Sequence, residues 1–170
     1  HPGKGTPAAE PTGPPAEKTT AWGATSSMAG SATDAQTTAV AAVRKLKRIR
    51  VYSPTPENRR AFIGKLEKLF PAITLSESTS VADAVKDAPI VTAVTRAREP
   101  IVTARMLAKG AHFNAVGAIT PEREEFAQDV FGRVDLLAVD MIASVKALSA
   151  EFRKRFGDGD WSSLHLLSDL

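Results

Sequence analysis

The chain has 170 residues, of which 43% are hydrophobic and 24% are charged. This balance is ordinary for a globular domain and excludes a fibrous or fully disordered protein. No apolar run approaches the roughly 20 residues that a bilayer-spanning helix needs, so we expect no membrane span and no membrane partner. The net charge of +3 is small, which argues against a dedicated nucleic-acid binder.

Cysteine is absent and histidine occurs only three times. The first fact excludes disulfides, thiolate chemistry and cysteine-ligated zinc. The second makes a histidine-rich metal site unexpected, so we assign no metal ligands.

The first residues are rich in proline and glycine and contain almost nothing to bury. Such a segment cannot offset its ordering entropy by burial, so we expect a disordered tail over 1–21 and one domain over 22–170. The tail has no apolar stretch typical of a secretory signal, and we expect a cytoplasmic protein. The chain does not begin with Met. A linker, a processed terminus or a part of a larger protein would explain this start, and we favour the last in view of the family resemblance given below.

From about residue 33 onward, helix-like and strand-like segments alternate. Strands are expected where β-branched and apolar residues alternate or cluster, at 48–53, 73–75, 89–95, 111–117 and 134–140. Helices are expected between them, over 35–46, from Pro56 to before Pro71, over 80–87 and 102–108, from Thr120 onward, and over 142–156. Two of these helices open with Thr-Pro-Glu, in which threonine caps, proline takes the first helical position and glutamate meets the helix dipole.

Strands separated by helices of this length predict an α/β fold of doubly wound, mostly parallel, Rossmann-like architecture with helices on both faces. The carboxyl ends of parallel strands share one edge, where such folds bind ligands. Helix amino termini at this edge suit an anion such as phosphate.

The segment from Gly30 to Ala35 lies where the glycine-rich turn of a dinucleotide-binding unit is expected. Gly30 and Ala35 fit the first and third places of that motif, but Ala32 occupies the place of its second glycine. The preceding residues, 24–29, make a poor strand. The residues alone leave a phosphate cradle and an ordinary loop open in equal measure.

Ser53, Thr55 and Arg59 follow the strand at 48–53, where the adenosine ribose of a dinucleotide would lie. An acidic residue there favours NAD, whereas a small polar residue with a nearby arginine favours the 2′-phosphate of NADP. We therefore favour NADP over NAD. The alternative is a capping Thr55 beside a solvated Arg59.

Two other polar features have simpler interpretations. The basic run between Arg44 and Arg50 has no interleaved aromatic residues, so we favour a solvated helix end over a nucleic-acid site. His112 alternates with apolar neighbours, and we expect a core histidine rather than a base.

Four segments resemble, in order and spacing, the nucleotide-binding domain of the ornithine cyclodeaminase/mu-crystallin family: 48–60, 88–102, 110–126 and 134–140. The string GAHFNAVGAITPEREEF is the most specific of them. The resemblance covers roughly residues 30–170.

The resemblance implies a two-domain, usually dimeric enzyme that uses NAD or NADP. Members of the family cyclise ornithine with loss of ammonia, reduce imines, or interconvert amino acids and keto acids. The substrate would be a small amino acid or imine, and the full-length parent a homodimer. The family's substrate domain comes mostly from sequence before the glycine-rich turn, so we expect that domain to be missing and this chain alone to be inactive.

The resemblance also implies which residues border the cofactor. These are Gly30, Ser31 and Ala35 at the pyrophosphate, Ser53, Thr55 and Arg59 at the adenosine ribose, Val94 and Thr95 at the other ribose, and Val116 and Gly117 beneath the nicotinamide.

One departure from the family bears on chemistry. Cyclodeaminases carry an acid/base aspartate two residues after the glycine that corresponds to Gly117, and here that place holds Ile119. Isoleucine cannot transfer a proton, so we favour a reductase- or dehydrogenase-like activity over true cyclodeamination and assign no catalytic residue. The alternative is a truncated or non-catalytic member that binds a small ligand or nucleotide without turnover.

Overall fold

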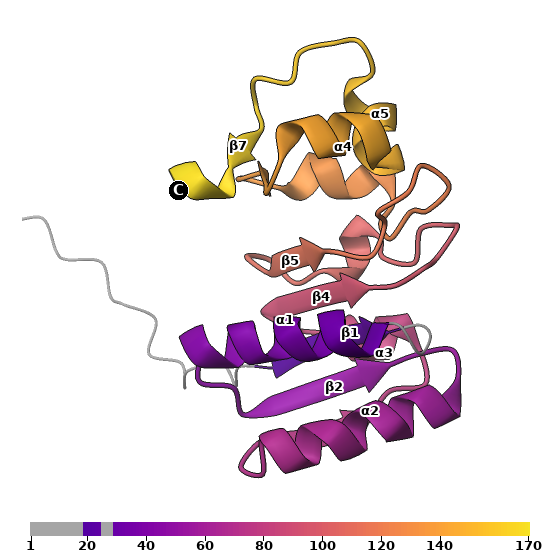
Figure 1. The fold of residues 1–170 in the computed structure, drawn as a ribbon, viewed down its shortest axis with the longest axis vertical. Helices are drawn as coiled ribbons and strands as arrows, with labels where there is room; N and C mark the ends of the chain where they lie inside the picture. Colours follow the sequence, from indigo (N-terminus) through magenta and orange to yellow (C-terminus); the bar gives the residue numbers. More distant parts are fainter. Residues whose placement is uncertain (1–18, 25–28) are drawn as a thin grey trace, which may run out of the picture.

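The computed structural model describes residues 19–24 and 29–170, with side chains from residue 32 onward. Its centre is a parallel five-stranded sheet of order β3-β2-β1-β4-β5, and the labelled arrows of this sheet point the same way in Figure 1. The strands are β1 (Thr19–Ala24), β2 (Arg48–Tyr52), β3 (Thr74–Glu77), β4 (Ile90–Val94) and β5 (His112–Ala115). The predicted doubly wound fold class is confirmed.

Helices cover both faces of this sheet. α1 (Ala29–Val43) and α2 (Pro56–Leu69) pack on one face. The short α3 (Val81–Val85) and the 3-10 turn η1 (Ala104–Met106) pack on the other. The chain therefore crosses over the sheet in the manner that parallel strands require.

Side chains alternate along the central strands, so they contribute to two separate hydrophobic cores, one on each face of the sheet. Ile49 and Val51 of β2 point toward α1 and α2, and they pack with Phe62 of α2. Val91 of β4 points the opposite way and packs with Val85 of α3. β4 is thus buried on both faces, as its run of β-branched residues predicts.

The first strand differs from the sequence-based expectation. β1 pairs with both β2 and β4 in the middle of the sheet, so residues 19–21, expected to belong to a disordered tail, lie in a strand. This strand ends at Ala24, the first residue of the poor candidate at 24–29. The two flanking ladders satisfy the backbone groups of Thr-Thr-Ala-Trp-Gly-Ala, a segment in which Ala and Gly weaken the strand preference of Thr and Trp. Residues 1–18 and 25–28 lie outside the described residues. α1 begins at Ala29, before the predicted start at 35.

Two predicted helices do not form. The segment expected to be helical over 102–108 contains only η1, and Thr120 opens a turn rather than a helix. The reason is that the loops after β4 and β5 pair with each other: Ile101 and Val102 N–H both donate to the Glu125 carbonyl at 3.1 Å, and Ala127 N–H donates to the Val102 carbonyl at 2.8 Å. This non-local pairing takes the backbone groups that a helix would use.

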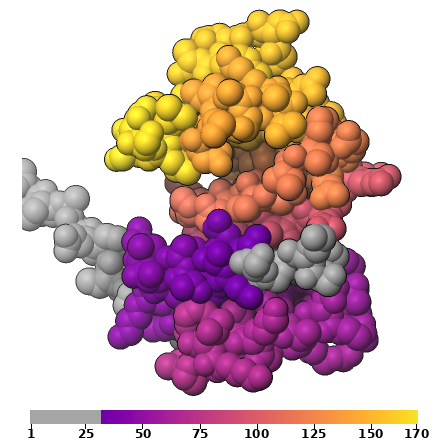
Figure 2. All heavy atoms as spheres, viewed as in Figure 1, coloured from indigo at the N-terminus to yellow at the C-terminus, as the bar shows by residue number. Residues whose placement is uncertain are grey.

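The C-terminal part forms a unit beyond β5, seen at one end of the molecule in Figures 1 and 2. Only β6 (Ala138–Val139) of the predicted strand 134–140 is extended, and it pairs with β7 (His165–Leu166) outside the main sheet. The predicted helix 142–156 is split into α4 (Ile142–Leu148) and α5 (Ala150–Phe156). Ser149 divides them because its backbone is extended and its hydroxyl accepts the Phe152 N–H at 3.4 Å.

Aromatic rings attach this unit to the sheet. Phe126, which follows the loop pairing, contacts Phe113 of β5 edge-to-face at 5.6 Å between centroids and Phe131 at 5.3 Å. Phe131, in the 3-10 segment η2 (Gln128–Arg133), contacts Phe152 of α5 at 5.2 Å. These rings fill the third core cluster.

The start of α2 follows its predicted signal in part. Pro56 occupies the first turn and Glu57 meets the helix dipole, but Thr55, at the capping position, makes no side-chain hydrogen bond to the helix. Its two leucines differ in burial, since Leu66 is 0% exposed whereas Leu69 is 55% exposed. No helix within the described part of the chain is long and apolar enough to cross a membrane.

This difference predicts unequal effects of two identical truncations. Leu66→Ala removes buried methyl groups between α2 and the sheet, and we expect it to lower the free energy of unfolding by about 2–5 kcal/mol. Leu69→Ala, on the same helix but in solvent, should change it by less than about 0.5 kcal/mol. Urea unfolding followed by circular dichroism measures both, and equal losses would contradict the packing described for α2.

Candidate functional site

The candidate residues gather along one edge of the sheet. All five strands are parallel, so their carboxyl ends meet at this edge. β1 lies between β2 and β4, with Gly23 opposite Tyr52 and Ala24 opposite Val94. Strand spacing of about 4.8 Å therefore separates the candidates after β2 from those after β4 by about 10 Å.

Ser53, Thr55 and Arg59 are brought together at the end of β2. Ser53 is 1% exposed, and its hydroxyl lies 3.4 Å from the Thr55 N–H that donates to it. The Arg59 guanidinium donates to the Ser53 carbonyl at 2.5 Å and to the Glu77 carboxylate at 3.1 Å. Arg59 is therefore mostly buried and ion-paired rather than solvated, and Glu77, at the end of β3, partly neutralises it.

Val94, Thr95, Val116 and Gly117 are brought together at the ends of β4 and β5. Val116 N–H donates to the Ala93 carbonyl at 2.9 Å, which continues the β4–β5 ladder by one step. Val94 and Val116 belong to the same core cluster, and Thr95 is buried. A Cβ on Gly117 would overlap the backbone nitrogen and oxygen of Thr95, so only glycine permits this approach.

A buried carboxylate that the sequence did not mark lies behind these residues. Glu125 is 0% exposed, and its two oxygens accept the Thr95 N–H at 2.5 Å and the Gly117 N–H at 2.7 Å. Burial raises the pKa of Glu125, the two backbone N–H groups lower it, and the nearby Glu151 raises it again, with a net shift upward. Glu125 belongs to the acidic run of a helix predicted from Thr120, and nothing in that run distinguishes the one carboxylate that folds inward.

Glu151 supports Glu125 from α5. Glu151 is 1% exposed, and one of its oxygens accepts the Glu125 backbone N–H at 2.8 Å. Its other oxygen accepts the Ser149 hydroxyl at 2.9 Å. A chain of hydrogen bonds thus runs from the edge of the sheet to the C-terminal unit.

The remaining candidates lie on α1. Gly30 and Ser31 are in its first turn, which follows β1 through residues outside the described part of the chain. Ala35 is exposed, whereas Thr33 and Thr37 are the fully buried residues in the part of this helix from residue 32 onward, where side chains are described. The helix position closest to the sheet is therefore taken by Thr33 rather than by Ala35.

Two further residues are relevant to proton transfer. Ile119, two residues beyond Gly117, is 65% exposed. His112 opens β5, at the opposite end of that strand from Gly117, and is exposed, with its Nε2 2.9 Å from Asn114 Oδ1. The expectation of a core histidine is wrong, because the edge-strand position of β5 leaves this side chain in solvent. Neither residue places an acid or base at the carboxyl edge.

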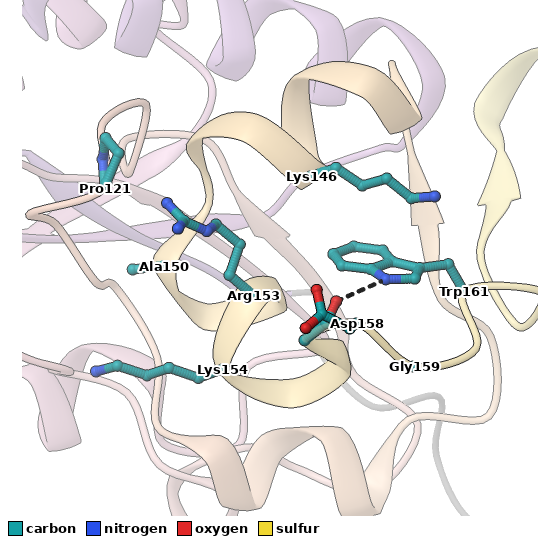
Figure 3. A pocket seen from close by; sticks show the side chains of 9 residues that line it. Pro121, Lys146, Ala150, Arg153, Lys154, Asp158, Gly159 and Trp161 are labelled. Carbon is teal, nitrogen blue, oxygen red and sulfur yellow. Dashed lines mark hydrogen bonds between the residues drawn. The ribbon is translucent and has the colours of Figure 1, made fainter.

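A separate open pocket lies among α4, α5 and Trp161 (Figure 3). None of the ten candidate residues lines it. Two of its cations have partners: Lys154 pairs with Glu124, and Lys146 lies 5.2 Å from the centre of the Trp161 ring. Within the described residues, no group of three or more His, Asp or Glu side chains could hold a metal ion.

Comparison with known protein families shows to which family this chain is related. Residues 27–148 match the model of the ornithine cyclodeaminase/mu-crystallin family. The chain belongs to this family. The resemblance seen in the sequence segments is thereby confirmed.

Curated relatives are 29% to 30% identical to this chain over the matched segments. A Delta(1)-pyrroline-2-carboxylate reductase of Bacillus cereus is 29% identical over 104 residues, 60% of this chain and 31% of that protein. The ketimine reductase mu-crystallin of Rattus norvegicus is 30% identical over 100 residues, 59% of this chain and 30% of its own length. An ornithine cyclodeaminase of Brucella suis is 30% identical over 109 residues, 63% of this chain and 30% of that enzyme.

Solved structures of the family share the fold. The Delta(1)-pyrroline-2-carboxylate reductase of Thermococcus litoralis, in complex with NADH and L-proline, has a TM-score of 0.75 at 24% identity over 88% of this chain and 45% of that chain. An archaeal alanine dehydrogenase dimer with bound NAD has a TM-score of 0.73 at 18% identity, over 89% of this chain and 45% of its own. The chain thus spans about a third of the length of its curated family relatives and less than half of these solved chains.

Because Gly117 lies against Thr95, replacing this glycine by alanine should cause a steric clash. A glycine with open space around it shows, by comparison, what alanine does to backbone entropy alone. Gly117→Ala forces the two strand ends apart, and we expect it to lower the free energy of unfolding by about 1–3 kcal/mol. Gly64→Ala, in α2 with open space around it, should instead stabilise the protein by about 0.5–1 kcal/mol. Thermal unfolding of both variants tests this, and a Gly117→Ala protein as stable as Gly64→Ala would contradict the described contact.

Proposed function

We propose that this chain binds NAD(P) across the carboxyl edge of β2, β4 and β5, as the nucleotide-binding domain of an oxidoreductase that acts on amino acids or imines. The observation that supports this best is the strand order β3-β2-β1-β4-β5. Its direction of progression reverses at β1, and in doubly wound sheets the ligand crevice lies at that reversal. A longer protein that contains this domain would be a homodimer, by analogy with the archaeal alanine dehydrogenase.

The residues on the two sides of β1 suit the two halves of a dinucleotide. On the adenosine side, Ser53 is small, uncharged and buried, with Thr55 exposed beside it. On the nicotinamide side, Val94 and Val116 supply apolar surface and Gly117 supplies bare backbone. When bound, the nicotinamide ring supplies hydride chemistry, while the protein's own groups orient the ring and exclude water.

The pyrophosphate would be bordered by the first turn of α1. Gly30 and Ser31 lie there, where N–H groups without helical partners suit an anion. In the dinucleotide-binding motif, the residue three positions after the second glycine packs against the sheet. The buried Thr33 fits that role with Gly30 as the second glycine. Ala35 lies two residues further along α1 and is exposed, so it does not pack beneath the pyrophosphate.

A reductase-like reaction suits the site better than cyclodeamination. The loop after β5 presents the exposed Ile119 where a cyclodeaminase-like acid/base would be needed. Isoleucine cannot exchange protons, so a proton for imine reduction would come from another part of the protein. Two of the compared relatives, from Bacillus cereus and Rattus norvegicus, are named as reductases.

Ile119 also supports a second candidate, a family member that binds the nucleotide without turnover. The two candidates differ in one observable. Oxidation of NADPH by this 170-residue chain in the presence of a cyclic imine acid would exclude the second. Because this chain alone is expected to be inactive, binding without turnover fits both candidates, and the same assay on a longer protein that contains this domain separates them: turnover there supports the first, and its absence supports the second.

Within the proposed function we favour NADP over NAD because of charge at the end of β2. Ser53 carries no carboxylate to repel a 2′-phosphate, and Arg59 is within reach of the ribose position through its contact with the Ser53 carbonyl. The Glu77 carboxylate competes for the same guanidinium. The strength of this preference therefore depends on how readily Arg59 exchanges Glu77 for phosphate.

Titration of NADPH and NADH, followed by nicotinamide fluorescence, tests both the binding and the preference. We expect saturable binding of both, and a fall of about tenfold or more in the NADPH-to-NADH affinity ratio for Arg59→Ala, because hydrogen bonds to a charged group contribute about 1.5–3 kcal/mol. Glu77→Gln should raise the ratio by freeing Arg59. Arg60→Ala, whose exposed side chain pairs with Glu57 instead, is the matched control and should leave it unchanged.

Two results would count against this account separately. Absence of saturable binding of either nucleotide contradicts the proposed function. Binding with a ratio that Arg59→Ala does not change contradicts only the preference for NADP.

A further inference from the structure

Where the β4–β5 ladder ends, the Glu125 carboxylate accepts the hydrogen bonds of the next backbone N–H groups. The last paired residues are Ala93 and Ala115, and one further bond runs from Val116 N–H to the Ala93 carbonyl. Beyond this, Thr95 and Gly117 have no strand partner among the described residues, and their N–H groups donate to the two oxygens of Glu125, at 2.5 and 2.7 Å.

Few other side chains could replace the Glu125 carboxylate in this arrangement. Both backbone partners are donors, so the central group must present two acceptors, and an ionised carboxylate has acceptors only. A glutamine at the same place would turn its NH2 group toward one of the two N–H donors. That donor would then be buried without a partner, which is costly.

The same two backbone segments define the proposed nicotinamide side of the site. Thr95 is buried, and Gly117 lies so close to it that no side chain fits between them. Their relative position therefore depends on the group that bonds to both. A rigid surface binds a ligand with less loss of entropy than one that must be ordered on binding.

We propose that Glu125 is a positioning residue that fixes the backbone of Thr95 and Gly117 for the nicotinamide half of the dinucleotide. The proposal rests on the function proposed above and adds to it a residue that does not itself touch the cofactor. It also divides the site: Glu125 acts on the nicotinamide half, and the contacts of Ser53 and Arg59 on the adenosine half are independent of it.

Glu151 provides a matched control because it is equally buried but differently bonded. One of its oxygens accepts the Glu125 N–H, and the other accepts a hydroxyl, that of Ser149. A hydroxyl can accept as well as donate, so Glu151→Gln keeps both bonds by donating its NH2 group to Ser149. Glu125→Gln has no such option at the Thr95 and Gly117 N–H groups, because a backbone N–H cannot accept.

The experiment compares NADH with ADP, which carries only the adenosine and phosphate part, for the wild-type chain and the two variants. Isothermal titration calorimetry gives both affinities, and circular dichroism confirms that each variant is folded. We expect Glu125→Gln to weaken NADH at least about tenfold, the effect of one misplaced hydrogen bond, and to change ADP less than about twofold. Glu151→Gln should change neither by more than about twofold.

The outcomes separate the two proposals. Equal weakening of NADH and ADP by Glu125→Gln would show a general structural role and overturn the positioning role, as would no weakening at all. Failure of the wild-type chain to bind either ligand would overturn the proposed function and the positioning role with it.

A measurement on the wild type covers the case in which Glu125→Gln does not fold. Amide hydrogen exchange at Thr95 and Gly117, followed by NMR without any nucleotide, reports whether the two N–H groups are held in advance. We expect both to exchange as slowly as the amides inside β4. Exchange of either at the rate of an exposed loop would overturn the proposal.

Discussion

Two backbone N–H groups at the ends of adjacent strands converge on the buried Glu125 carboxylate, and this contact joins the parts of the molecule that matter for function. An uncompensated buried charge is expensive, and the raised pKa of Glu125 reflects that cost. The hydrogen bonds to it are of the charge-assisted kind and offset part of the penalty. The carboxyl edge of the sheet thus contains a buried carboxylate whose desolvation costs free energy, and hydrophobic burial alone would not place it there.

The surroundings of Glu125 explain how the chain brings it inward. Its backbone carbonyl accepts from Ile101 and Val102, and its backbone N–H donates to Glu151 on α5. Phe126, the next residue, packs among the rings that hold the C-terminal unit against β5. The carboxylate is therefore anchored on both sides by contacts made far along the chain, and the geometry of the edge depends on the packing of the aromatic cluster.

Local signals in the sequence account for much of the sheet and part of the site. The run of β-branched residues in β4 and the Pro-Glu start of α2 identify those elements, and the alternation of strands and helices leads to the parallel order. Ser53, Val94 and Gly117 could be placed at one edge because strand ends are readable from such patterns. β1 could not, because its pairing with two neighbours outweighs a weak intrinsic preference.

The predictions that were wrong, and the residues that the sequence did not identify, share a physical cause. Residues 102–108 and those after Thr120 have the local features of helices, yet their backbone groups bond to each other across more than twenty residues of sequence. The sequence could not identify Glu125 for the same reason, because its carboxylate is buried only once the two loops have paired. Likewise, a helical pattern does not reveal that Thr33 rather than Ala35 faces the sheet, because the choice depends on the angle at which α1 crosses it.

A dinucleotide across the carboxyl edge of the sheet would be detected by an NMR titration of the isotopically labelled chain with NADH. We expect the backbone amide signals of Ser53, Thr95 and Gly117 to shift together with one saturation curve, while those of Arg153 and Trp161, in the separate pocket, stay in place. Shifts confined to that pocket, or saturation of one strand end without the others, would contradict this expectation.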